Sequence, residues 1–251
     1  MLLSHRKQFL FIHIPKTAGT SITRRLAPHA RLRDRLVYEF RPTRLAIAIA
    51  DRAMRRADDG LALYAGFPQH AAIRNARDAL GDDWTNALFK FAFVRDPWDW
   101  FASLWAHAAR TPGHPLQQDA RAGIEPFLET ACRGGVLRQI DYVRRRGSLE
   151  LDVDFLGRFE TLREDFRAVA DRLGLSARDL PHDNRAPARA RDLSSLYTPS
   201  ARRLFLKRFG PDLELFGYAE SPGAPPPVGP VELPRRENRT DREPTSKEQE
   251  S

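Results

Sequence analysis

The chain has 251 residues, of which 41 are basic, 33 are acidic and only one is a cysteine. This length suits one medium-sized domain with a substantial core, and a single cysteine excludes both an intramolecular disulfide and a cysteine-based zinc site. No apolar run approaches the roughly 20 residues that a membrane helix needs. We therefore expect no transmembrane segment and a cytoplasmic protein.

The basic residues are almost all arginine, with 36 arginines against 5 lysines. A GC-rich genome and a surface that attracts anionic partners both explain this excess, and the composition leaves the two open. Seven of the 19 prolines lie in residues 221–251, which contain almost no large apolar side chains. That composition predicts a disordered, charged tail after a domain that spans residues 1–220.

The domain alternates strand and helix patterns along the chain. Short apolar runs predict buried strands over residues 9–14, 88–94 and 153–159. Helical spacing and helix-boundary residues predict helices from residue 21 to 26, over 44–57 and 72–80, from 97 to about 109, after 161, and from 199 to about 210. Strands followed by helices in this order predict an α/β domain with three layers (α/β/α) and a central, mainly parallel sheet.

Capping residues support three of these boundaries. Asp96 and Pro97 form the cap and the first position of one helix, and Thr161 with Glu164 forms a capping box for the next. The last helix is expected to end near Gly210. In a parallel sheet the ligands bind beyond the carboxyl ends of the strands, so the loops after the first two strands are the candidate sites.

The first of these loops runs from Pro15 to Ser21. Gly19 allows a tight turn, and the amides of Gly19, Thr20 and Ser21 would be the unpaired donors at the start of the next helix. Hydroxyl groups and the Lys16 ammonium add to this cradle for a phosphate-like group. Because the lysine precedes the glycine, the loop is not a Walker A motif. A glycine used only for packing in a βα turn is the alternative interpretation.

A second anion site is indicated at the end of the next strand. Arg95 can bind a phosphate through two parallel hydrogen bonds, and Ser103 lies on the helix that follows. The alternatives are a salt bridge from Arg95 to a helix carboxylate and a solvated position for Ser103. Trp98, Trp100 and Trp105 are predicted to line the core or a groove.

Residues 11–21 resemble the 5'-phosphosulfate loop of the sulfotransferase family 2 type, which includes carbohydrate sulfotransferases, and residues 91–103 resemble its 3'-phosphate segment. Further similarity follows in order over 153–166, 180–184 and 216–218. The positions of Trp100 and Trp105 depart from the family, which more often has arginine and tyrosine there. The resemblance implies a P-loop NTPase-like fold and transfer of a sulfuryl group from 3'-phosphoadenosine-5'-phosphosulfate (PAPS) to a hydroxyl, on a carbohydrate, without a metal.

The resemblance also implies a role for each site residue. The 5'-phosphosulfate would be held by Lys16, Thr17, Ala18, Gly19, Thr20 and Ser21. Arg95 and Ser103 would hold the 3'-phosphate, and Phe159 would lie near the adenine. Lys16 would also stabilise the charge on the bridging oxygen as its bond to sulfur breaks.

A general base must take the proton of the acceptor hydroxyl, and histidine has a suitable pKa. Seven histidines are present. His70 resembles in placement the base of family members that act on uronic acid-containing glycans, whereas Glu39 is the rival because some relatives use glutamate. His13 is expected in the core, His182 in a structural loop, and His5, His29, His107 and His114 at the surface or in loops.

Two other classes of function compete with this prediction. A basic protein that binds a polyanion or nucleic acid without catalysis would explain the arginine excess, but aromatic residues are not interleaved with a basic patch. A kinase is disfavoured because Walker A is absent and no clear magnesium-binding carboxylate lies near the loop. Nucleic acid is therefore not the expected partner.

Overall fold

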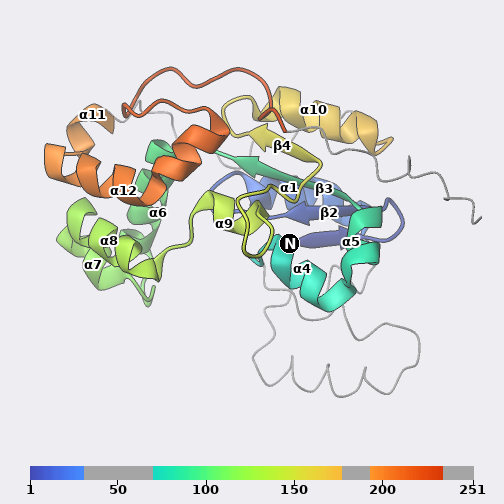
Figure 1. Cartoon of the computed structure of the whole chain (residues 1–251), viewed down its shortest axis with the longest axis horizontal. Coiled ribbons are helices and arrows are strands. Elements are labelled where there is room, and N and C mark those ends of the chain that lie inside the picture. The colour runs from blue at the N-terminus through green and yellow to red at the C-terminus, as the bar shows by residue number, and fades with distance from the viewer. Residues whose placement is uncertain (31–69, 177–192, 234–251) are drawn as a thin grey trace, which may run out of the picture.

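A computed structural model describes residues 1–30, 70–176 and 193–233, which fold around a four-stranded mixed sheet (Figure 1). The sheet order is β1-β2-β3-β4; β2, β3 and β4 are parallel, and β1 is antiparallel to β2. The strands are β1 Leu2–Ser4, β2 Phe9–Ile12, β3 Phe89–Val94 and β4 Phe155–Arg158. The predicted α/β class with a mainly parallel sheet is confirmed.

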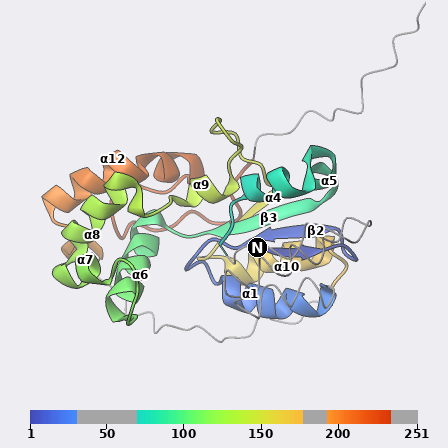
Figure 2. The same cartoon turned by 90° about the horizontal axis from the view of Figure 1, so that it is seen from below.

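Helices cover both faces of this sheet (Figure 2). Alternate residues of a strand point to opposite faces, and the central strands are apolar on both. Phe9, Phe11, Phe91 and Phe93 pack with residues of α1 and α10, whereas Leu10, Ile12, Ala92 and Val94 pack in a separate cluster with residues of α4 and α9. The helices of the two faces are α1 Gly19–Leu26, α10 Leu162–Arg172, α4 Ile73–Leu80, α5 Asp82–Ala87 and α9 Gln139–Val143.

A lobe of helices extends the second cluster beyond the carboxyl end of β3 (Figures 1 and 2). Its aromatic centre includes Trp98 stacked on Phe205, with ring centroids 3.8 Å apart, and Phe101 against Phe209 at 5.2 Å.

None of the helices in the described ranges is long and apolar enough to cross a membrane. The remaining elements are η1 Ala27–His29, α6 Pro97–Arg110, α7 Gln117–Ala122, α8 Ile124–Thr130, the π-helical turn η3 Ala131–Gly135, α11 Leu193–Leu196 and α12 Pro199–Phe216.

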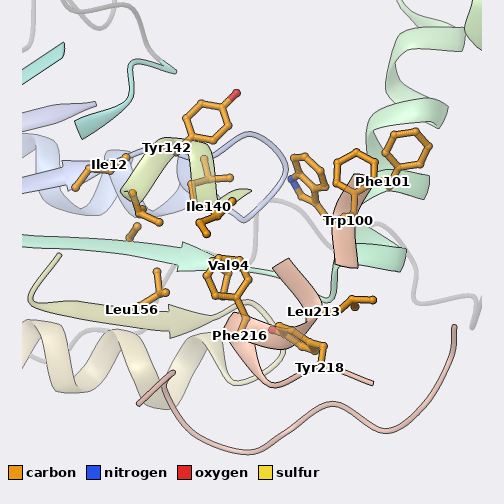
Figure 3. Packing of buried hydrophobic residues seen from close by; sticks show 14 of the residues in the cluster. Ile12, Val94, Trp100, Phe101, Ile140, Tyr142, Leu156, Leu213, Phe216 and Tyr218 are labelled. Carbon is orange, nitrogen blue, oxygen red and sulfur yellow. The ribbon is translucent and has the colours of Figure 1, made fainter. Parts of the chain in front are cut away.

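The structure corrects one predicted helix end and one predicted capping box. Helix α12 continues through Gly210 and Pro211 to Phe216, because Leu213 and Phe216 on its last turns are buried in the core (Figure 3). Thr161 precedes α10 as predicted, but its side chain does not cap the helix backbone; its hydroxyl donates to Asp165 Oδ2 at 2.8 Å. Strand β1 and the short helices between residues 117 and 143 had no clear sequence pattern. The helix predicted over residues 44–57 lies outside the described residues.

The predicted start of the disordered tail is wrong for residues 221–233. The backbone N–H of Val231 donates to Leu156 O at 2.8 Å, and Val231 is buried. Arg158 Nε donates to Gly229 O at 2.8 Å. This proline-rich segment is held on β4 by hydrogen bonds to the Leu156 carbonyl and from the Arg158 guanidinium, which the composition of the segment did not indicate. Residues 234–251 lie outside the described part of the chain.

Asp212 of α12 makes the fold sensitive to pH. Its carboxyl is fully buried and one oxygen accepts from Gln139 N at 2.8 Å, and burial raises its pKa to about 7. The folded protein therefore holds this proton more tightly than the unfolded chain, so its contribution to stability is lost as pH rises from about 4 through 7. We expect the Asp212→Asn protein to lose less stability than the wild type between pH 5 and pH 8 in urea unfolding.

The exposed Asp171 of α10 gives a matched control. The Asp171→Asn protein should keep the wild-type dependence on pH. Identical pH dependence in the Asp212→Asn and wild-type proteins would show that Asp212 does not carry this effect.

Candidate functional site

The loop after β2 has an unusual backbone conformation. Lys16 and Ala18 adopt positive φ angles of 64° and 63°, on either side of Thr17. Alternation of left-handed with right-handed residues forms the backbone concavities that bind anions. The Thr17 hydroxyl is buried and donates to Ile14 O at 3.0 Å, which fixes the turn from inside.

Helix α1 begins directly after this turn and adds its own amides. The first helical hydrogen bond runs from Ile22 N to Ala18 O at 3.2 Å, so the preceding amides of Gly19, Thr20 and Ser21 are the donors that a first helical turn leaves without an intrahelical partner. The helix dipole favours an anion at this end. Lys16 lies at the start of the loop and is half-buried.

His13 packs directly beneath the loop and requires a glycine above it. A Cβ atom on Gly19 would lie 1.9 Å from His13 Cδ2. His13 is 3% exposed, and burial, with smaller effects of His70 and the N-terminus, lowers its pKa to about 2. Its expected place in the core is confirmed, and it adds no charge at neutral pH. The glycine is therefore required by close packing against His13.

His70 lies against His13. Its Nδ1 is 3.1 Å from His13 O, and the two rings meet edge to face with centroids 4.7 Å apart. When Nδ1 donates to this carbonyl, the neutral ring carries its lone pair on Nε2, as a proton acceptor needs. The structure thus brings His70 next to the residue that supports the loop.

Arg95, at the end of β3, joins the second loop to the first. Its Nη1 donates to Lys16 O at 3.2 Å, and its guanidinium lies over the Phe159 ring, 4.3 Å from the centroid. It also forms a salt bridge with Asp99, with Nε to Oδ2 at 2.8 Å. The alternative salt bridge to a helix carboxylate is therefore present. Arg95 also contacts the loop at Lys16 and carries Phe159 against its guanidinium.

The backbone around Arg95 is held by later parts of the chain. Gln139 of α9 accepts from Arg95 N at 2.9 Å and donates to Arg95 O at 2.8 Å. Asp96 caps α6 as predicted, accepting from Trp98 N at 2.8 Å, and burial with the nearby Glu160 raises its pKa to about 6. Ser103 is half-buried one turn beyond Asp99 on α6, on the same helical face.

A cavity of about 240 Å³ adjoins the loop at Pro15. Pro15 forms part of its wall, and the indole N–H of Trp100 donates to Pro15 O at 2.8 Å. Figure 3 shows Trp100 on α6 beside the loop that follows β2. Trp98 and Trp100 are fully buried and Trp105 is half-buried, in agreement with their predicted core or groove positions.

His107 and His114 also line this cavity, with ring centroids 6.0 Å apart. His107 was assigned to the surface from the sequence, and its ring is indeed partly exposed, but α6 carries it to the cavity wall. Burial, and then the charges of Lys16, His114 and Arg110, lower the pKa of His107. His107 lies four residues after Ser103 on α6, and residues four apart share a helical face. This spacing could have indicated that His107 faces the site.

Lys16 to Ser21, Arg95, Phe159 and His70 therefore lie in one region at the carboxyl ends of β2 and β3, whereas Ser103 is placed only on α6, one turn beyond Asp99. Lys16 to Ser21 form the loop, Arg95 and Phe159 touch it or each other, and His70 lies below it. Glu39 and His182 lie outside the described residues. No cluster of three or more residues able to hold a metal ion occurs within residues 1–30, 70–176 and 193–233.

Comparisons with protein-family models, with curated proteins and with solved structures find no match to this chain. The chemistry of the site therefore has to be argued from its own residues. Backbone amides, a lysine and an arginine in adjoining loops are suited to a ligand that carries two anionic groups.

Gly19→Ala tests the packing beneath the loop. Its methyl group would overlap the His13 ring, so we expect a loss of about 1–3 kcal/mol in the free energy of unfolding. The loop should also move, and binding of anionic ligands should weaken. Calorimetric melting and ligand titration measure both effects.

Gly210→Ala is the matched control, because no atom lies within 4 Å of an added Cβ in that helical position. It should be neutral or stabilising by up to about 1 kcal/mol. Equal melting temperatures for the Gly19→Ala and Gly210→Ala proteins would contradict the packing argument.

Proposed function

We propose that this protein is a sulfotransferase that uses PAPS as its donor, with a P-loop NTPase-like arrangement of sheet and loop. The observation that carries the proposal is the hydrogen bond from Arg95 Nη1 to Lys16 O at 3.2 Å. It joins two anion-binding loops at neighbouring ends of parallel strands. A donor with phosphate groups at both ends of a nucleoside fits such a pair of loops.

The residues present fit this donor. The amides of the loop and the Lys16 ammonium would hold the 5'-phosphosulfate, because Gly19 leaves the backbone uncovered and α1 directs its positive end there. Arg95 and Ser103 would hold the 3'-phosphate. Asp99 keeps the guanidinium oriented, and the phosphate would share or replace that carboxylate. Phe159, half-buried under Arg95, would offer its ring to the adenine.

The transfer needs alignment and charge stabilisation more than covalent chemistry, as phosphoryl transfer does. The acceptor oxygen forms a bond to sulfur, and the bond between sulfur and the bridging oxygen of the 5'-phosphate breaks. The acceptor proton passes to a base. Lys16 would stabilise the negative charge that remains on the released phosphate.

His70 is the base in this proposal. When its Nδ1 donates to His13 O, the proton acceptor of the neutral ring is Nε2. The hydroxyl of a carbohydrate is the acceptor that the family resemblance implies. The chemistry described here assigns no step to a metal ion.

Lys16→Ala and Arg95→Ala test the donor site. Each should reduce turnover with PAPS by about 100-fold or more and weaken binding of the product 3'-phosphoadenosine-5'-phosphate (PAP), because each removes a charge from the bound anions. Radiolabelled sulfate transfer and isothermal titration calorimetry measure the two effects. Lys207→Ala and Arg203→Ala, which remove exposed charges from α12, are the matched controls.

Donor binding that is unchanged in both site variants would refute the assignment of the two loops. Strongly salt-dependent binding of a polyanion such as heparin, with no turnover, would instead support the alternative of a non-catalytic polyanion-binding protein.

His70→Asn should lower kcat by about 10²–10⁴-fold while PAP binding stays unchanged, because the variant loses the proton acceptor and keeps the donor loops. The acidic limb of the dependence of kcat on pH should also disappear. His29→Asn, at a histidine outside the site, is the control. If His107→Asn abolishes turnover and His70→Asn does not, the base is misassigned.

A further inference from the structure

The cavity beside the loop has a composition that bears on the acceptor. It is formed by parts of the chain that are distant in sequence, including Pro15 after β2, Leu104 on α6, Phe127 on α8, Val136 after η3 and Tyr142 on α9. At about 240 Å³ it is smaller than the roughly 300–1,000 Å³ of pockets for drug-sized ligands. A group of one or two rings matches this size.

The lining is mainly apolar and aromatic. No Lys, Arg, Asp or Glu side chain is among the described residues that line it; its polar groups are the two imidazoles of His107 and His114 and the phenol of Tyr142. A uronic acid or a densely hydroxylated sugar buried here would leave polar groups without partners, at a cost in free energy. An apolar ring would instead gain by leaving water.

The polar groups are suited to one hydroxyl. His114 Nδ1 accepts from Leu116 N at 3.1 Å, so its neutral ring carries the proton on Nε2. Tyr142 is 7% exposed, and Figure 3 shows its hydroxyl turned away from the strands. Burial, with the charge of Asp141, raises the pKa of Tyr142 to about 12, so the phenol stays protonated as a donor.

The cavity also reaches the proposed transfer site. Pro15 is part of its wall and is followed directly by Lys16, and Trp100 holds the Pro15 carbonyl at 2.8 Å. His107, on the same wall, is near enough for the charge of Lys16 to lower its pKa. A molecule seated in the cavity therefore lies next to the loop proposed to hold the phosphosulfate.

We propose that this cavity binds the acceptor, and that the acceptor is a small apolar alcohol with one or two rings, such as a phenol or an alicyclic alcohol, in place of the carbohydrate that the family resemblance implies. The inference rests on the proposed sulfotransferase function. Its hydroxyl oxygen takes the sulfuryl group from PAPS, its proton goes to the base, and PAP leaves. The apolar ring occupies the space between Trp100, Leu104 and Phe127.

The test uses 2-naphthol as a fluorescent acceptor and a hyaluronan oligosaccharide as the acidic-glycan competitor. We expect 2-naphthol to bind the PAP-loaded protein and to be sulfated with a higher kcat/KM than the oligosaccharide. Leu137→Trp places a bulky aromatic ring at the cavity wall. Leu137 is 38% exposed, so we expect the variant to fold. It should raise the KM for 2-naphthol at least ten-fold and leave the Kd for PAP unchanged.

Leu149→Trp is the matched control, because Leu149 is 60% exposed and is not part of the cavity wall. It should leave both constants unchanged. Three results would overturn the acceptor class and leave the donor proposal standing. They are PAP binding without 2-naphthol binding, an unchanged KM in the Leu137→Trp protein, and a higher kcat/KM for the oligosaccharide. Absence of PAP binding would overturn the proposed function, and the acceptor assignment with it.

Discussion

The parallel pairing of β2 with β3 is the constraint on which the candidate site depends. It places the carboxyl ends of the two strands side by side, so that the loop from Pro15 to Ser21 adjoins the start of α6. Two donors from the β3 side then bind carbonyls of that loop: Trp100 Nε1 to Pro15 O, and Arg95 Nη1 to Lys16 O. Without this register, the two loops would not be joined.

The support for these loops comes from buried polar groups as much as from apolar packing. Gln139 satisfies both backbone groups of Arg95 and is itself held by the fully buried Asp212. Glu160 accepts from Asp96 N and from the Tyr218 hydroxyl, which links the start of α6 to the end of α12. A buried polar group without its partner is costly, so such contacts fix a single arrangement of these helices around the site.

The two halves of the site are built by different means. The proposed donor side is formed by backbone amides and two cations at strand ends, groups that are suited to an anionic ligand. The cavity is formed by side chains from α6, α8, α9 and the turn η3, and its lining is mainly apolar. His13 and His107 have lowered pKa values, so they add no positive charge at neutral pH. The charge that would attract the donor is therefore concentrated in Lys16, Arg95 and the helix end.

The sequence by itself predicted strands over 9–14, 88–94 and 153–159, which the structure shortens to 9–12, 89–94 and 155–158, and it predicted the helices that follow them and the Asp96 cap. Hydrophobic period and capping residues act over a few neighbouring residues, so these features can be read locally. Only the tertiary structure decided what depends on distant segments. It packs 221–233 against β4, extends α12 past Pro211 to bury Phe216, joins Arg95 to the carbonyl of Lys16, and brings His107 to a cavity beside Lys16. Those outcomes follow from burial between elements far apart in the chain, which no local pattern records.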